Sequence, residues 1–110
     1  GNTMPGQPTA IIFQPYQIVG NHATYLPAAV TTIPIPNGAN AMFVQATGQN
    51  VRIKLDGTAP TTGGGFQIRA GDPPFLLPLP QAIGAQPSIL ALQEASAATL
   101  EVQGVIQAFA

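Results

Sequence analysis

Charged side chains are scarce in this chain of 110 residues. It has three lysines and arginines and four aspartates and glutamates, so 6% of its residues are charged, against about 25% in an average soluble domain. Charge keeps free monomers soluble and apart, so a chain with so little of it and a net charge of −1 is expected to associate. We therefore favour a subunit that packs against others. A neutral secreted domain covered by glutamine and threonine is the alternative.

Cysteine is absent, which excludes disulfides, thiolate metal sites and thiol catalysis. Small extracellular domains often depend on disulfides, so the absence favours folding in a reducing cytoplasm or stabilisation by oligomerisation. At this length we expect one domain with one modest core.

Signals for membranes and nucleic acids are also missing. The N-terminus has neither a basic region nor a continuous apolar core, and no run of about 18 apolar residues occurs. We expect no signal peptide, no transmembrane helix and no membrane partner. The few basic residues argue against a nucleic-acid partner, because phosphate binding needs clustered lysine and arginine.

The most regular stretch of the sequence is Asn50–Gly71. Apolar and polar residues alternate over Val51–Asp56 and again over Phe66–Ala70, on either side of a Gly/Thr/Pro loop. This period of two predicts a pair of half-buried antiparallel strands. All the basic residues of the protein fall on their polar face: Arg52, Lys54 and Arg69.

Two interpretations of this basic face remain open. In one it is a solvated surface, with cross-strand pairs to Asp56 or Glu101. In the other it docks an acidic surface of a partner.

The rest of the chain shows further short apolar runs between Gly/Pro turns. We predict strands over Tyr16–Val19, Ala23–Leu26, Ala28–Ile35, Ala41–Thr47, Phe75–Leu79, Ser88–Gln93 and Ala98–Gln107, after a shorter apolar run at Ala10–Phe13.

Some of these strands carry more specific expectations. Ala41–Thr47 and Val51–Asp56 should form a hairpin around the intervening turn, and the proline in Phe75–Leu79 makes it an edge strand. Gly104 breaks the alternation of the last strand, as at a bulge. A short helix over Leu90–Leu100 is an alternative, because its residues are good helix formers.

Strands at intervals of about 8–12 residues predict an all-β protein, an antiparallel β-sandwich of jelly-roll-like type. Within this single domain, residues 1–36 are rich in proline and should form an extended N-terminal arm and edge strands. Residues 37–110 should form the core of the sandwich.

No residue constellation for catalysis or metal binding is apparent. His22 is the only histidine, and no acidic cluster lies near it in sequence. Asp56 and Asp72 flank one loop, but both sit beside glycine in turns, where aspartate is common for backbone reasons. Ser88 and Ser96 lack the GxSxG context of a nucleophile. We expect a protein that is not an enzyme and needs neither a metal nor a cofactor.

The segment VRIKLDGTAPTTGGGFQIRAGD, followed by strands like ILAL and ATLEVQGVIQ, resembles a pattern found in small virion proteins of tailed bacteriophages. Arg52, Asp56–Thr58, Pro60–Thr61 and Ala70–Asp72 carry the match, which covers roughly Ala41–Ala110.

The resemblance implies a non-enzymatic virion component, foremost a head decoration (cement) protein, or else a small collar, head-fibre or tail-associated protein. It implies a homotrimer that binds the major capsid protein or other virion proteins, made in the host cytoplasm and located in the virion. The proline-rich start would then reach across a neighbour as an arm.

Partner contacts are expected at basic and aromatic side chains: Arg52, Lys54, Arg69, Phe13, Tyr16 and Tyr25. The rival function is a carbohydrate- or receptor-binding module of a phage fibre, collar or tail. Such modules stack sugars on exposed aromatic rings, and tryptophan is absent here. Only Tyr16 and Tyr25 would offer tyrosine rings to this function.

Overall fold

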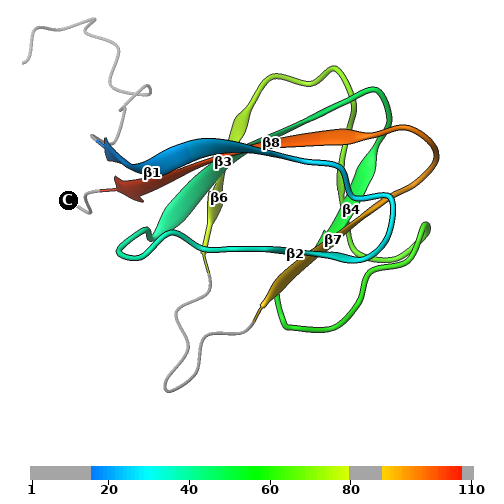
Figure 1. Cartoon of the computed structure of the whole chain (residues 1–110), viewed down its shortest axis with the longest axis horizontal. Helices are drawn as coiled ribbons and strands as arrows, with labels where there is room; N and C mark the ends of the chain where they lie inside the picture. Colours follow the sequence, from blue (N-terminus) through cyan, green and yellow to red (C-terminus); the bar gives the residue numbers. More distant parts are fainter. Residues whose placement is uncertain (1–15, 80–87, 108–110) are drawn as a thin grey trace, which may run out of the picture.

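The computed structural model describes residues 16–79 and 88–107, which form two stacked four-stranded sheets without a helix (Figure 1). In strand order, the first sheet contains β1 (Tyr16–Tyr25), β8 (Thr99–Gln107), β3 (Ala41–Thr47) and β6 (Phe75–Pro78). The second sheet contains β2 (Thr31–Ile33), β7 (Ile89–Gln93), β4 (Val51–Lys54) and β5 (Phe66–Ile68).

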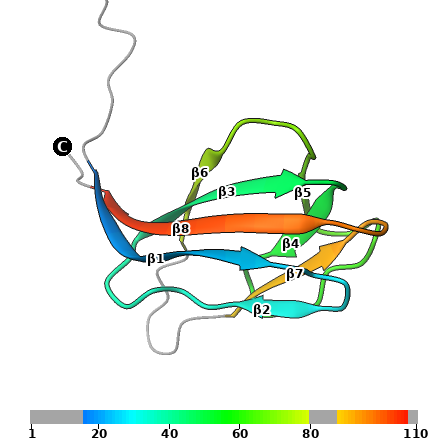
Figure 2. The same ribbon diagram turned by 45° about the horizontal axis from the view of Figure 1, so that its top comes forward.

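The strand pairs are nested along the chain. β1 pairs with β8, β2 with β7, β3 with β6 and β4 with β5, all antiparallel. Additional pairing of β8 with β3 and of β7 with β4 completes each sheet. Figure 2 turns the first sheet toward the viewer, so that β3, β8 and β1 lie one below another, with β7 and β2 of the second sheet beneath them. The prediction of an all-β antiparallel sandwich is confirmed.

The core lies between the sheets and is apolar throughout the described residues. Alternate side chains of each strand point into it, as the two-residue period of a strand requires. In the first sheet Met42, Val44 and Leu100 are almost wholly buried, and in the second Val51 and Ile53 face them. Each such side chain contributes about 1.5–3 kcal/mol when fully buried.

The predicted hairpin of β3 with β4 is wrong, although both strands exist. They belong to different sheets, and the turn between them crosses from one layer to the other. Both strands bury apolar residues against the same core from opposite sides, so they face each other. Gly48 permits the crossing: its φ is +82°, and a side chain there would overlap the carbonyl oxygen of Ala97.

The two short strands predicted around Gly20 are one long strand, β1. Its register against β8 shifts between Val19 and Ala23, so that residues 20–22 lie opposite Gln103 alone. The amide of Gln103 donates to the carbonyls of Val19 (3.3 Å) and Gly20 (3.1 Å) and so closes the bulge. Gly20 does not end the strand, because a glycine with φ +73° fits a bulge.

The bulge expected at Gly104 is therefore in the partner strand. Gly104 keeps regular register with Val19 and Met42 on its two sides. The alternation breaks there because Pro36 packs over the missing side chain: a Cβ on Gly104 would lie 2.6 Å from Cγ of Pro36. Glycine at this position allows close packing of a neighbouring segment onto the strand.

The structure also tests four other sequence predictions about strands. The antiparallel pair of β4 and β5 is confirmed, and β6 lies at a sheet edge as its proline indicated. Only Thr31–Ile33 of the predicted strand Ala28–Ile35 is a strand, since prolines flank it. The alternative helix over Leu90–Leu100 is not formed, because Ile89 and Ala91 alternate into the core. The apolar run Ala10–Phe13 lies outside the described residues.

The proline-rich third of the chain supplies edge strands. β1 and β2 are the outermost strands on one side of the sandwich, and β6 and β5 are outermost on the other. Ile33 of β2 is buried in the core, so this segment is also part of the folded body.

The packing at Gly104 predicts that Gly104→Ala destabilises the protein. The new methyl would meet Pro36 at 2.6 Å and the Val19 carbonyl oxygen at 2.9 Å, and such overpacking costs about 1–3 kcal/mol. Gly63→Ala, at a site with no atom within 4 Å, is the matched control and should change the free energy of unfolding by less than about 0.5 kcal/mol. Urea denaturation measures both; equal effects would contradict the proposed contact.

The register of β8 predicts that Val102→Asp prevents folding. Val102 is 4% exposed and belongs to the core, where an unpaired carboxylate costs more than about 3 kcal/mol. Ile106→Asp, on the same strand at a position 40% exposed, should leave the protein folded. Circular dichroism and thermal melting distinguish the two, and a folded, soluble Val102→Asp protein would disprove this register.

Candidate functional site

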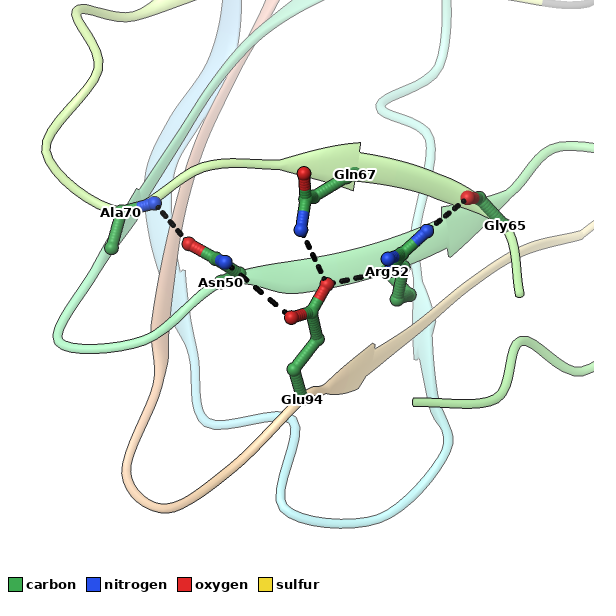
Figure 3. A network of polar contacts seen from close by, with 6 residues as sticks. All are labelled: Asn50, Arg52, Gly65, Gln67, Ala70 and Glu94. Atoms are coloured by element: carbon green, nitrogen blue, oxygen red, sulfur yellow. Dashed lines mark hydrogen bonds and ion pairs between the residues drawn. The ribbon is translucent and has the colours of Figure 1, made fainter. Parts of the chain in front are cut away.

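The outer face of the second sheet carries a hydrogen-bonded network centred on Glu94 (Figure 3). Glu94 follows β7, and its carboxylate accepts from Arg52 Nε at 2.6 Å, Gln67 Nε2 at 2.8 Å and Asn50 Nδ2 at 3.4 Å. Hydrogen bonds from Gln67, then Arg52 and Asn50, hold the pKa of Glu94 below its usual value. Arg52 also donates to the carbonyl of Gly65 (3.0 Å). The network thus ties β4, β5 and the end of β7 together.

This network bears on the two interpretations of the predicted basic face, because it gives one of the basic residues a partner within the chain. Arg52 has a cross-strand partner, but it is Glu94, and neither Asp56 nor Glu101 takes that role. The sequence did not reveal this pair because its members are 42 positions apart and meet only once β4 and β7 are neighbours.

The other two basic residues lie nearby without comparable partners. Lys54 continues the outer face of β4, and exposed Arg69 follows β5; neither side chain makes a hydrogen bond or ion pair with another described residue. Asp56 sits in a turn, where hydrogen bonds from Thr58, and to a lesser degree the charge of Lys54, lower its pKa. The three basic side chains are therefore accompanied by two carboxylates, which leaves little net charge on this face.

The outer face of the first sheet contains a hollow of about 410 Å³. Tyr16 of β1 and Phe43 of β3 form its aromatic part, with ring centroids 5.3 Å apart in an edge-to-face arrangement. The registers place Tyr16 opposite Gln107 and Phe43 opposite Gln103, so the two rings meet over Val105 of β8, which is fully buried. Tyr16 remains 50% exposed.

Polar groups line the same hollow. His22 Nε2 donates to Oε1 of Glu101 at 2.6 Å, and the Thr24 hydroxyl donates to the same oxygen at 2.8 Å. These bonds, that of His22 first, lower the pKa of Glu101. The side chains of Gln45 and Gln103 complete the polar lining.

The bulge in β1 explains how His22 reaches the hollow. It adds residues opposite Gln103 and brings His22 beside Glu101, a residue 79 positions away in sequence. The Thr24 hydroxyl donates to the carboxylate and makes no hydrogen bond to the imidazole, so the hydroxyl–imidazole pair of a nucleophilic enzyme is not formed between these residues.

The other two aromatic residues predicted to contact a partner, Tyr25 and Phe13, are not among the described residues that line this hollow. Tyr25 is half-buried and packs against the core cluster, so its ring is not presented to a partner as that of Tyr16 is. Phe13 lies outside the described residues.

A second concave surface lies where the two sheets end on the β5/β6 side. This edge groove, of about 460 Å³, has no charged residue in its lining: Ile53, Leu55, Phe66, Gln67, Ile68, Phe75, Leu77 and Pro78. Phe66 and Phe75 are 66% and 42% exposed. Apolar side chains are thus exposed at this side of the sandwich, where no further strand covers them among the described residues.

Within the residues that the structure describes, no group of three or more His, Cys, Asp or Glu side chains is placed to hold a metal ion. No described helix is long and apolar enough to span a membrane.

Comparison of the chain with protein-family models, with curated proteins and with solved structures finds no match in any of the three.

The Glu94 network predicts a dependence of stability on pH. Because the pKa of Glu94 is lower in the folded than in the unfolded chain, its contribution is fully present above the ordinary value of 4.5 and is lost as the pH falls through the lowered folded value. Glu94→Gln should therefore flatten the acid side of the stability profile.

Melting temperatures between neutral and acidic pH test this expectation. Asp72→Asn is the control, since the exposed side chain of Asp72 makes no hydrogen bond with another described residue. An acid profile of Glu94→Gln parallel to that of the unsubstituted protein would contradict the role of the network.

Proposed function

We propose that this chain is a non-enzymatic structural subunit of a tailed-bacteriophage virion, a decoration (cement) protein that binds and stabilises the head lattice as a homo-oligomer, with a trimer favoured. Its partners are further copies of itself and the major capsid protein. The nested strand order supports the jelly-roll-like architecture that the sequence resemblance implies for such proteins.

The observation that carries the proposal is the uncharged edge groove between β5 and β6. Exposed aromatic side chains beside two sheet edges are a liability in a free monomer, because apolar patches and unpaired strands promote association. Few charges elsewhere on the chain oppose that association. We assign the groove to contact between copies of this chain, since a second copy brings an equally uncharged surface.

The physical mechanism is burial of apolar area, at about 25 cal/mol per Å². Covering the exposed parts of Phe66 and Phe75 contributes at most about 1.5–3 kcal/mol for each ring. Closed symmetry repeats the contact at every interface of the oligomer. Binding of many copies to the assembled lattice then stabilises that lattice by mass action.

The test has two measurements. Sedimentation of the purified protein should give the mass of an oligomer, and the protein should co-sediment with phage heads that lack it. Phe66→Ser and Phe75→Ser should each shift the mass toward the monomer and weaken binding to heads. Leu26→Ser, which removes an apolar side chain that is 71% exposed outside the groove, is the matched control. A monomer at high concentration that never co-sediments with heads would refute the proposal.

The N-terminal segment gives a further prediction for this function. Residues 1–14 contain no charged side chain and include the apolar run Ala10–Phe13, which suits an arm that adds to a neighbour. Their deletion should weaken attachment to heads by more than it lowers the melting temperature of the domain. If the melting temperature falls in parallel with attachment, the segment belongs to the folded core and does not serve as an arm.

A further inference from the structure

We propose that the hollow on the first sheet is a binding site for a neutral saccharide. The site lies over β1, β8 and β3 and shares no lining residue with the edge groove, so the inference does not depend on the proposed function. Its volume of about 410 Å³ falls within the range of about 300–1,000 Å³ that is usual for small-ligand sites.

The aromatic side of the hollow offers a surface for the C–H face of a sugar ring. Tyr16 is half-exposed, and its edge-to-face contact with Phe43 restricts the orientation of its ring. Val105 is buried beneath the pair, so the platform rests on packed side chains. An aromatic body with a hydroxyl at its tip can contact apolar and polar parts of one ligand together.

The polar side of the hollow presents mainly hydrogen-bond acceptors. Both donors that reach Glu101 bind Oε1, which leaves Oε2 as an acceptor. The amide nitrogens of Gln103 and Gln45 already donate to backbone carbonyls: Gln103 to Val19, Gly20 and Gly104, and Gln45 to Asp72. Their side-chain oxygens, together with the second N–H of the Gln45 amide, are then the groups available to a ligand.

A ligand that fits must therefore combine an apolar face with several hydrogen-bond donors. A saccharide does so, because its hydroxyls donate while its C–H groups stack on an aromatic ring. The carboxylate of Glu101 disfavours acidic sugars through like-charge repulsion. Because His22 and Thr24 occupy Oε1 of Glu101, only Oε2 is left for a ligand, which disfavours the two-oxygen pairing that a guanidinium makes with a carboxylate.

The experiment is a glycan array probed with the full chain, followed by titration of the best ligands into isotopically labelled protein with amide shifts as readout. The array carries neutral and acidic glycans, and a lysine- and arginine-rich peptide is titrated in parallel. We expect binding of neutral glycans, with shifts at Tyr16, Gln45 and Gln103. Tyr16→Ala and Gln45→Leu should each weaken binding by about tenfold or more.

Leu26→Ala is the matched control, because it removes an exposed apolar side chain that lines neither the hollow nor the edge groove; binding should not change. Both Tyr16→Ala and Gln45→Leu are measured because one of them could lose binding by unfolding. A lowered melting temperature would identify that variant, and the other would then give the result. The proposal is overturned if no glycan binds, if acidic glycans or the basic peptide bind in preference, or if both hollow variants bind as well as the unsubstituted protein.

Discussion

The apolar contact between the two sheets is the constraint on which the rest of this structure depends. Every strand presents alternate residues to it, and none of the buried side chains among the described residues is polar. Because the inward-facing residues of the strands are apolar, the polar residues that alternate with them lie on the outer faces of the sandwich. Within the described residues, the surfaces that can meet a partner are thus the two outer faces, the four sheet edges and the connecting turns.

The two outer faces are used differently. On the second sheet, Glu94 collects donors from Arg52, Gln67 and Asn50, so this face is occupied by contacts that hold its own strands together. On the first sheet, the bulge of β1 brings His22 to Glu101 and leaves a hollow beside the aromatic pair. Several of the few charged side chains are also paired within the chain: Arg52 with Glu94, and Glu101 with His22. The surface available to neighbours is therefore even poorer in charge than the composition indicates.

The edge groove and the hollow place different demands on the environment of the protein. The groove lacks charge and exposes aromatic rings, which favours permanent burial against another subunit. The hollow mixes an aromatic pair with acceptors, which favours reversible binding of a small polar ligand. The two surfaces have no lining residue in common, although Pro74 of the hollow directly precedes Phe75 of the groove.

The sequence by itself determined the all-β class, the strands Ala41–Thr47 and Ser88–Gln93 to within a residue, and the antiparallel pair of β4 with β5. These features follow from local alternation and turn residues, which act over a few positions. Tertiary structure alone decided that β3 and β4 lie in opposite sheets, that Arg52 meets Glu94 and that His22 meets Glu101. Alternation says which side chains are buried but not which strand lies beside which, because that choice depends on how the whole chain rolls around one shared core.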